Sequence, residues 1–428
     1  MNIYISGITG TGMGPLALMA KTAGFRVSGS DLAKGAIYDE LMQAGIDVFI
    51  GEQDGEFLRK KMVEGVDWFV HTSALPVDHS ELLVAKEAEI KITKRDDFTA
   101  FLVEKLGLKM VAVAGTHGKT TTTAMIVWAA LREGLPVSYI VGTTLGFAPS
   151  GAYHEGDKFF IYEADEYDRN FLKYHPWLAV IPSVSYDHPD IYPTREDYEK
   201  AFKQFKRQSE RVIENTADGL KNEAGEELLI GPKRFKLAGE ARRIDAALAT
   251  EAIIQMDFQE AEYAMKDIDY ASSPIVDIMN EFPGVGRRFE KIAEGVYTDY
   301  AHHPEEIAAT IEVAQEEARM TNRKGVVVVY QPHQNTRQHE VKDGYREVFE
   351  GVTKVFWLPT YLTRENPNLP VLEPADFIDD LKNKEVAEVA ELDEELEKEL
   401  REYLKDGYLV ILMTAGPADG WLRERFSE

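Results

Sequence analysis

Short apolar runs that end in glycine-rich or polar turns recur along the chain. Residues 2–7 are β-branched or aromatic and typical of a strand, a glycine-rich turn follows, and residues 15–23 are typical of a helix. Two further apolar runs, at residues 25–29 and 67–71, also end in small polar residues. A doubly wound parallel sheet begins in this order of strand, glycine turn, helix and strand. The pattern therefore predicts an α/β domain over residues 1–107.

The same alternation starts again at residue 108. An apolar run at residues 109–114 enters a glycine-rich loop, and residues 121–132 are typical of a helix. Two more apolar runs, at residues 159–163 and 177–182, end in acidic or polar residues. We therefore expect a second α/β domain over residues 108–284.

The last third of the chain has continuous apolar runs that alternate with helical segments. Such runs are typical of parallel strands that are buried on both faces. A third domain is expected over residues 285–428, so the predicted fold class is α/β with three domains. The elements expected in this domain are strands at residues 296–299, 326–330, 355–358 and 408–413 and a helix at residues 304–319.

Composition and charge exclude several classes of function. The 428-residue chain has a formal net charge of −26, which argues against partners such as nucleic acid or an anionic membrane. It has no cysteine, which excludes disulfides, thiolate zinc sites and a cysteine nucleophile. Because no signal peptide or membrane-spanning run is found, we expect a cytoplasmic protein. Nothing in the sequence specifies an oligomeric state.

The segment VAVAGTHGKTTTT, residues 111–123, has the features of a phosphate-binding loop. Gly115 and Gly118 permit a tight backbone path, so that successive N–H groups and a helix N-terminus can bind phosphate oxygens. Lys119 can reach the outer phosphates, and Thr120 offers a hydroxyl to Mg²⁺. The alternative is a glycine-rich turn with a surface lysine. The order of strand, loop and helix favours an ATP site.

Two polar turns follow apolar runs in the same predicted domain. The first is EADEYD, residues 163–168, and the second is SYDHPD, residues 185–190. Carboxylates at the carboxyl end of a parallel strand face the ligand crevice and suit Mg²⁺. Histidine beside carboxylates can ligate a metal or move a proton. The alternatives are an acidic surface loop and a turn with a local hydrogen bond, but the nearby phosphate loop favours a metal site.

Other polar turns lie near the two ends of the chain. Arg287 and Arg288, the DYAHHP segment at residues 299–304 and the QPHQNTR segment at residues 331–337 are ordinary turns one by one. They adjoin predicted strands, so they could converge at one sheet edge to bind anions. The N-terminal turn, residues 7–12, is an imperfect dinucleotide fingerprint with an acidic residue after the second strand. Alone, it fits either a nicotinamide-dependent oxidoreductase or a site for the diphosphate of a nucleotide sugar.

The motifs together resemble the Mur ligase family. The resemblance rests on GITGTGMG, GSD, HTSA, GTHGKTTT, EADEYD, SYDHPD, GVGRRFE, DYAHHPEE and QPHQNTR, in this order over almost the whole chain. It implies a Rossmann-like UDP-binding domain, a central P-loop ATPase domain and a Rossmann-like C-terminal domain. Within the family, the motifs favour ligation of L-alanine to UDP-N-acetylmuramate through an acyl phosphate, in peptidoglycan precursor synthesis. The close alternative is attachment of a recycled murein tripeptide to the same sugar. A third possibility is a binding module that has lost its activity.

The resemblance implies that ATP and two Mg²⁺ ions are the cofactors. Lys119, His188 and Arg288 would be catalytic, with Lys119 on the β- and γ-phosphates. Thr120 with Glu163 would bind one Mg²⁺, and His188 with Glu163 would bind the second. The residues implied for ATP are Gly115, Thr116, His117, Gly118, Lys119, Thr120, Thr121, Asp299 and His302.

The resemblance also implies a path for the UDP-sugar along the first glycine turn. Four features depart from the family pattern. Thr9 stands where a glycine is usual, and the middle domain is short. Residues 239–245, GEARRID, replace an expected Gly-x-His-Asn segment near the adenine, and the last strand ends in AGPAD, residues 415–419, a modified form of the family's Ala-Gly-Asp ending. The adenine contacts therefore stay open. The residues implied for the sugar substrate are Gly10, Gly12, Met13, Asp31, Ser73 and His303.

Overall fold

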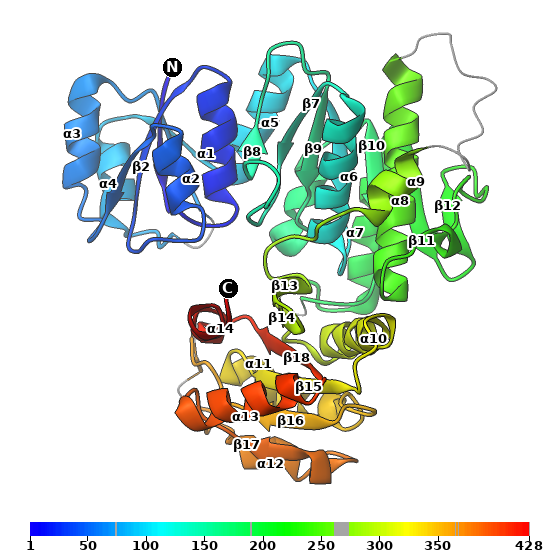
Figure 1. The fold of residues 1–428 in the computed structure, drawn as a ribbon. Coiled ribbons are helices and arrows are strands. Elements are labelled where there is room, and N and C mark those ends of the chain that lie inside the picture. Colours follow the sequence, from blue (N-terminus) through cyan, green and yellow to red (C-terminus); the bar gives the residue numbers. More distant parts are fainter. Residues whose placement is uncertain (73–74, 189–190, 261–273, 364, 367, 428) are drawn as a thin grey trace. The chain divides into compact units, whose positions relative to one another are not determined.

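Three β-sheets follow one another in the part of the chain that the structure describes (Figure 1). The structure is a computed structural model that describes residues 1–72, 75–188, 191–260, 274–363, 365–366 and 368–427. Contacts divide the chain into two compact units. The first is Met1–Phe235 with Ile244–Pro283, and the second is Lys236–Arg243 with Gly284–Glu428.

The first sheet is parallel and has the strand order β3-β2-β1-β4-β5. The order reverses at β1, which pairs with β2 on one side and β4 on the other. α/β sheets bind ligands at such a switch point, beyond the carboxyl ends of the strands. The strands are β1 (Asn2–Ser6), β2 (Arg26–Asp31), β3 (Asp47–Ile50), β4 (Trp68–His71) and β5 (Lys91–Lys94). The helices are α1 (Met13–Thr22), α2 (Tyr38–Gln43), α3 (Glu56–Glu64), α4 (Ser80–Glu87) and α5 (Arg95–Leu106).

The second sheet has the order β12-β11-β10-β6-β9-β7-β8, with antiparallel pairs at both edges. One apolar core runs through both sheets, since Ile5 and Leu16 belong to the same cluster as Ala112 and Ile181. The shared core explains why the two sheets form one unit. The strands are β6 (Lys109–Val113), β7 (Val137–Ile140), β8 (Gly151–Ala152), β9 (Phe159–Glu163), β10 (Leu178–Ile181), β11 (Arg211–Thr216) and β12 (Gly219–Asn222). The helices are α6 (Lys119–Glu133), η1 (Tyr167–Lys173), α7 (Arg195–Gln208), η2 (Pro232–Arg234), α8 (Glu240–Glu260) and α9 (Pro274–Asn280).

The third sheet has the order β13-β14-β18-β15-β16-β17, and only its β13–β14 pair is antiparallel among the residues described. Val328 faces one core and Val327 the other, as a continuous apolar strand predicts. The strands are β13 (Glu290–Ala293), β14 (Val296–Asp299), β15 (Val326–Gln331), β16 (Lys354–Trp357), β17 (Ala387–Val389) and β18 (Leu409–Thr414). The helices are α10 (Pro304–Met320), α11 (Asn335–Val341), η4 (Lys342–Tyr345), α12 (Pro374–Ile378), η5 (Lys384–Val386), α13 (Glu394–Lys405) and α14 (Ala418–Phe426).

The segment Lys236–Arg243 belongs to the second unit although it precedes most of α8. Ala238 packs in the core of the third sheet. The carboxylate of Glu316 accepts hydrogen bonds from the backbone N–H of Gly239 and the guanidinium of Arg243, both at 2.7 Å. The chain therefore passes between the units here as well as near residue 284. The predicted domain limits, residues 1–107, 108–284 and 285–428, stay a prediction.

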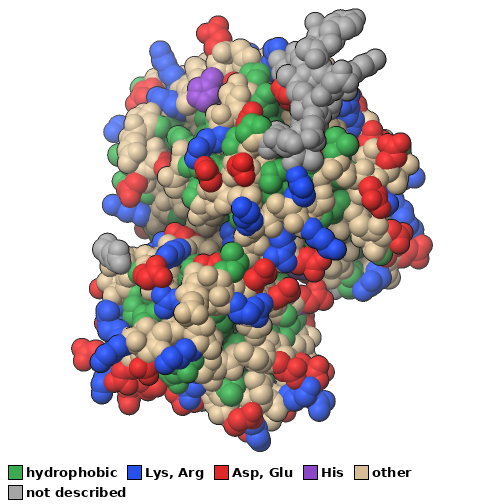
Figure 2. All heavy atoms as spheres, turned by 45° about the vertical axis from the view of Figure 1, so that its right-hand side comes forward, with side chains coloured by type: hydrophobic (Ala, Val, Ile, Leu, Met, Phe, Trp, Pro, Cys, Tyr) green, Lys and Arg blue, Asp and Glu red, His purple; other side chains and the backbone are tan. Residues whose placement is uncertain are grey.

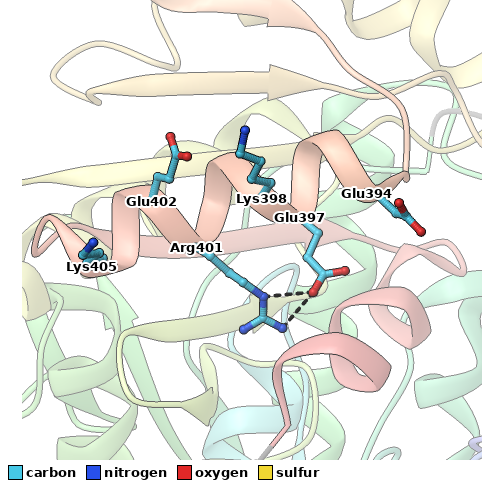
Figure 3. Close-up of a pocket in the computed structure, with 6 residues that line it drawn as sticks. All are labelled: Glu394, Glu397, Lys398, Arg401, Glu402 and Lys405. Atoms are coloured by element: carbon cyan, nitrogen blue, oxygen red, sulfur yellow. Dashed lines mark hydrogen bonds and ion pairs between the residues drawn. The ribbon is translucent and has the colours of Figure 1, made fainter.

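Charged side chains of both signs lie on the surface (Figure 2). On the face shown in Figure 2, acidic and basic side chains are interspersed. Helix α13 buries Leu396 and Leu400 and presents a charged face along its length, where Arg401 donates to Glu397 at 2.9 Å (Figure 3). No helix described here is long and apolar enough to cross a membrane.

Candidate functional site

The GTHGKT loop connects β6 to α6, and the two polar turns follow the neighbouring strands. β9 and β10 flank β6, so the acidic turn after β9 and residues 185–188 after β10 lie beside the loop at the carboxyl ends of these strands. The last two residues of the SYDHPD segment, Pro189 and Asp190, lie outside the described residues. The loop needs glycine at two places. A Cβ on Gly115 would lie 2.7 Å from the carbonyl oxygen of Ser183, and one on Gly118 would lie 2.7 Å from Oδ1 of Asp245. Gly118 also has a φ of +84°, which disfavours other residues.

The turn after β10 fixes the front of the loop. Ser183 accepts the backbone N–H of Thr116 on its carbonyl oxygen at 3.0 Å and that of His117 on its hydroxyl at 2.8 Å. The hydroxyl of Thr116 donates to the carbonyl of Ser185 at 2.6 Å and accepts the N–H of Ser185 at 2.8 Å. Gly118 is the N-cap residue of α6, which begins at Lys119. The loop is thus held on one side, and the positive end of α6 follows it.

Lys119 folds back over the loop and pairs with an acidic residue. Its ammonium donates to the carbonyls of Gly115 and Thr116 and, at 3.0 Å, to Oε1 of Glu166, whose side chain is 1% exposed. Burial alone would lower the pKa of Lys119, but the carboxylates of Glu166 and Glu163 raise it above its ordinary value. Burial likewise opposes ionisation of Glu166, yet Lys119 and His188 hold its pKa below the ordinary value. The pair is therefore a buried ion pair at neutral pH.

Glu163, at the end of β9, contacts the hydroxyl of Thr120. This hydroxyl donates to Oε1 of Glu163 at 2.9 Å. The other oxygen, Oε2, is buried and has no hydrogen-bond partner in the described part of the chain. A buried carboxylate oxygen beside a threonine hydroxyl fits Mg²⁺, which prefers hard oxygen ligands. The described residues contain no cluster of three or more His, Asp or Glu side chains placed to hold a metal.

His188 meets a different carboxylate from the one that the sequence suggested. Its Nε2 lies 3.6 Å from Oε1 of Glu166 and 3.6 Å from Oδ2 of Asp187. His188 has a φ of +57°, and its ring packs edge-on against Tyr167. Burial lowers the pKa of His188, but the nearby carboxylates of Glu166 and Asp187 raise it above the ordinary value. In this structure Glu166, rather than Glu163, connects Lys119 to His188.

Sequence reasoning therefore missed two residues of the site. Glu166 lies in the EADEYD motif, but the motif suggested Glu163, the last residue of β9, as the acidic residue of the site. Asp245 of α8 accepts the hydroxyl of Thr122 at 3.0 Å and packs on Gly118. It lies in the GEARRID segment, whose departure from the family pattern was the available signal. The segment therefore contributes to the support of the phosphate loop.

The N-terminal glycine turn is held by the end of β2. The carbonyl of Ser30 accepts the N–H groups of Gly7 and Ile8 at 2.8 and 3.1 Å. Asp31 accepts both the N–H and the hydroxyl of Thr9 on Oδ2, at 2.9 and 2.7 Å. The threonine that departs from the family pattern thus fastens the turn to the acidic residue.

The other predicted sugar contacts in this unit differ in exposure. Gly10 is exposed, and Met13 is buried in the apolar core. Gly12 lies against the guanidinium of Arg95, where a Cβ would clash. Ser73 lies outside the described residues. Gly10 and Gly12 therefore belong to the accessible part of the turn, whereas Met13 supports it from below.

In the second unit, the predicted residues gather beyond the end of β14. Asp299 is 7% exposed and accepts the N–H groups of Phe289 and Ala301 at 2.6 and 2.7 Å. Burial raises the pKa of Asp299 above its ordinary value, against the lowering effect of Arg288. Asp299 therefore holds the arginine loop onto the strand and is itself covered by it.

The two histidines of the DYAHHP segment lie at the start of α10. His302 contacts the carbonyl of Tyr300 at 3.0 Å through Nδ1 and the guanidinium of Arg337 through Nε2, and burial lowers its pKa. His303 is the N-cap residue of α10, and Glu306 accepts its N–H at 3.3 Å. Segments 299–304 and 331–337 thus converge, as the sequence suggested.

The neighbouring arginines of the GVGRRF segment have different environments. Arg287 donates to the carbonyls of Thr414 and Gly416 at 2.6 and 3.3 Å, which ties it to the end of β18. Both guanidinium groups lie near the Tyr300 ring, at 4.7 Å from its centre for Arg287 and 5.1 Å for Arg288, but only Arg287 donates to these carbonyls. Arg287 therefore stabilises the end of β18, and Arg288 is the better candidate to bind an anionic ligand.

Family profiles match three segments of the chain, and relatives cover almost its full length. "Mur ligase family, catalytic domain" matches residues 2–105, "Mur ligase middle domain" residues 113–228 and "Mur ligase, glutamate ligase domain" residues 287–416. The UDP-N-acetylmuramate–L-alanine ligase of Carboxydothermus hydrogenoformans is 30% identical over 97% of this chain and 94% of its own length. The chain belongs to the Mur ligase family. The corresponding ligase of Burkholderia pseudomallei is also 30% identical, over 98% of this chain and 96% of its own.

Solved structures of Mur ligases share the fold. The UDP-N-acetylmuramate–alanine ligase of Thermotoga maritima has a TM-score of 0.77 at 22% identity, over 99% of this chain and 98% of its own. A murein peptide ligase of Psychrobacter arcticus has a TM-score of 0.60 at 20% identity, over the same shares of the two chains. The predicted three-domain α/β architecture is confirmed, and membership in the Mur ligase family makes the protein an ATP-dependent ligase. The oxidoreductase alternative is not supported.

Proposed function

We propose that this protein joins L-alanine to the lactyl carboxylate of UDP-N-acetylmuramate and converts ATP to ADP and phosphate in the same reaction. The observation that carries the proposal is the full-length similarity to alanine-adding ligases, together with a phosphate loop whose lysine and acidic partners meet at one sheet edge. The product would enter peptidoglycan precursor synthesis in the cytoplasm. The UDP-sugar would lie along the first glycine turn of residues 1–107 and ATP on residues 108–284, and residues 285–428 would form the C-terminal ligase domain.

Phosphate binding would exchange the partners of Lys119. In the structure, its ammonium bonds two loop carbonyls and Glu166. We infer that the β- and γ-phosphates take over these bonds, because a phosphate offers more negative charge than one carboxylate. The N-terminus of α6, with Thr120 and Thr121, would bind the same phosphates. Asp299 and His302 of the second unit are also proposed for ATP binding. Asp299 would act indirectly, because it holds the loop that carries Arg288.

Two Mg²⁺ ions are proposed as cofactors, which would neutralise phosphate charge. Thr120 and Glu163 would hold the first, because Glu163 has a buried oxygen with no hydrogen-bond partner in the described part of the chain. His188 was predicted to share the second ion with Glu163. The structure favours Glu166 as the acidic neighbour of His188, since their side chains lie 3.6 Å apart. If His188 and Glu166 held the second ion, Glu166 would bind the ion in place of Lys119.

The chemistry follows from the weakness of a carboxylate as an electrophile. A lactyl oxygen attacks the γ-phosphorus, the bond to the β-phosphate oxygen breaks, and an acyl phosphate and ADP form. The alanine amine then attacks the acyl carbon, the C–O bond to phosphate breaks, and the amine loses one proton. Positioning and charge neutralisation supply most of the rate enhancement in such phosphoryl transfers. Arg288 would bind the transferred phosphate, and His303 would lie near the substrate.

A substrate panel tests the proposal. Purified protein with ATP, Mg²⁺ and UDP-N-acetylmuramate should release phosphate with L-alanine. Controls omit the sugar or replace L-alanine with glycine, L-serine and D-alanine. Phosphate release with the murein tripeptide, but none with L-alanine, would move the assignment to the recycling ligase. Sugar binding without turnover on any of these amines would favour a binding module that has lost its activity.

A further inference from the structure

A carboxylate is buried inside the first sheet's domain, away from the predicted ATP site. Glu81, the second residue of α4, is 1% exposed and accepts four hydrogen bonds. The hydroxyls of Tyr4 and Ser30 donate to Oε1 at 2.5 and 2.6 Å. The hydroxyl of Ser6 and the amide of Gln53 donate to Oε2 at 2.7 and 3.3 Å. Burial of a carboxylate is costly unless such bonds satisfy it, so an arrangement this complete indicates a specific role.

Three of the four donors come from the two strands that precede the predicted sugar contacts, Tyr4 and Ser6 from β1 and Ser30 from β2, and Gln53 follows β3. Ser6 is the last residue of β1, and Ser30 is its register partner in β2. Gln53 adds a bond to the hydroxyl of Ser30 at 2.8 Å. Glu81 lies in the first turn of α4, where the helix dipole favours a negative charge. One carboxylate thus ties the carboxyl ends of β1 and β2 to a helix.

The bonds continue from Ser30 into the glycine turn. Its hydroxyl donates to Glu81, while its carbonyl accepts the N–H groups of Gly7 and Ile8. The next residue, Asp31, accepts the N–H and hydroxyl of Thr9. The first half of the turn is therefore hydrogen-bonded to the end of β2, and Glu81 bonds to the same end of that strand through Ser30.

We propose that Glu81 is a positioning residue for the UDP-sugar, which sets the glycine turn through Ser30. This inference rests on the proposed function, since it assumes that the turn binds the nucleotide sugar. A residue that only stabilised the domain would change the unfolding temperature without a selective effect on one substrate. Glu81 instead affects the geometry of the first turn and leaves the phosphate loop of α6 as it is.

Calorimetry on the full chain tests the inference with two ligands. Dissociation constants for UDP-N-acetylmuramate and for a non-hydrolysable ATP analogue are measured for wild type, Glu81→Gln and Ser30→Ala. Glu87→Gln is the control, because Glu87 is exposed at the other end of α4. We expect Glu81→Gln to weaken sugar binding about tenfold and Ser30→Ala about threefold, since each loses hydrogen bonds to a charged group. Binding of the ATP analogue should stay at the wild-type value, and Glu87→Gln should bind both ligands normally.

The following results would contradict the positioning role of Glu81. Folded Glu81→Gln with wild-type sugar affinity, or with equal losses for both ligands, would overturn the positioning role. If Glu81→Gln fails to fold, Ser30→Ala alone carries the test by the same criteria. A wild-type protein that does not bind UDP-N-acetylmuramate would overturn the proposed function, and the inference with it. This last result is recognised from the wild type before any variant is measured.

Discussion

The phosphate loop after β6 and the glycine turn after β1 share a local plan, in which a buried strand passes through glycines into a helix. They differ in how their polar groups are satisfied. Around the phosphate loop, Lys119 is held by Glu166, and Oε2 of Glu163 has no hydrogen-bond partner among the described residues. Around the first turn, Asp31 and Glu81 have their oxygens occupied by hydroxyl, amide or backbone donors.

This difference indicates two ways of binding a phosphate-containing ligand. Beside the central loop lie the Lys119–Glu166 ion pair and Oε2 of Glu163, which has no hydrogen-bond partner among the described residues. These groups can bind new partners when ATP and a metal bind. The first turn keeps its internal bonds and presents a fixed shape. We therefore expect substitutions at the central loop to affect turnover strongly and those beneath the first turn to affect affinity more weakly.

The largest effect is expected for Lys119→Ala. Loss of the ammonium removes the cation that would bind the transferred phosphate, so kcat should fall by ~10³-fold. Phosphate release measures turnover, and calorimetry should show unchanged UDP-sugar binding. Lys203→Ala is a matched control, because the side chain of Lys203 is 66% exposed on α7. Full activity of Lys119→Ala would contradict the assignment of the central loop as the ATP site.

Glu163→Gln tests the uncompensated oxygen. The amide keeps the shape of the side chain but loses its charge, so the Mg²⁺ concentration for half-maximal activity should rise by about 10- to 100-fold. Titration of activity with Mg²⁺ at fixed ATP gives the measurement. Glu155→Gln, on the exposed segment before β9, should titrate as wild type does. An unchanged Mg²⁺ requirement would show that Glu163 is not a ligand.

Gly118→Ala tests the close packing of the loop. Gly134 at the other end of α6 gives the control: it has a φ of +69° and open space around its Cα, whereas a Cβ on Gly118 would meet Asp245 and Pro182. Both alanines are strained by positive φ, but only Gly118→Ala also clashes, so its loss of unfolding free energy should be larger, about 2–3 kcal/mol against ~1 kcal/mol. Thermal unfolding compares the two. Equal losses would contradict the packing argument.

The smallest effect is expected for Thr9→Val beneath the first turn. The valine removes the hydroxyl, which contacts Oδ2 of Asp31 at 2.7 Å and the carbonyl of Ala33 at 2.9 Å, and leaves the backbone bond to Asp31 in place. Loss of these contacts, one of them to a charged group, should cost about 1–2 kcal/mol of unfolding free energy. Thr9→Ser keeps the hydroxyl and should behave as wild type. If Thr9→Val lowers turnover as much as Lys119→Ala does, the first turn is not the fixed partner that the comparison assumes.

Local features of the fold were predictable because each depends on a short segment of the sequence. The run at residues 326–330 predicted a strand buried on both faces, and β15 has this environment. The order of strand, GTHGKT and helix predicted the loop at the start of α6. In contrast, the link between Lys236–Arg243 and the third sheet depends on contacts with Val313 and Glu316, which are about seventy residues away.

The sequence by itself determined which strand ends carry polar residues, since periodicity and glycine placement act within a few residues. The tertiary structure decided which polar residues meet. It placed β9 and β10 on either side of β6 and thereby paired Lys119 with Glu166. It also tied Arg287 to β18. Such pairings depend on strand order and on how far each turn reaches past its strand, and these follow from the packing of the whole sheet.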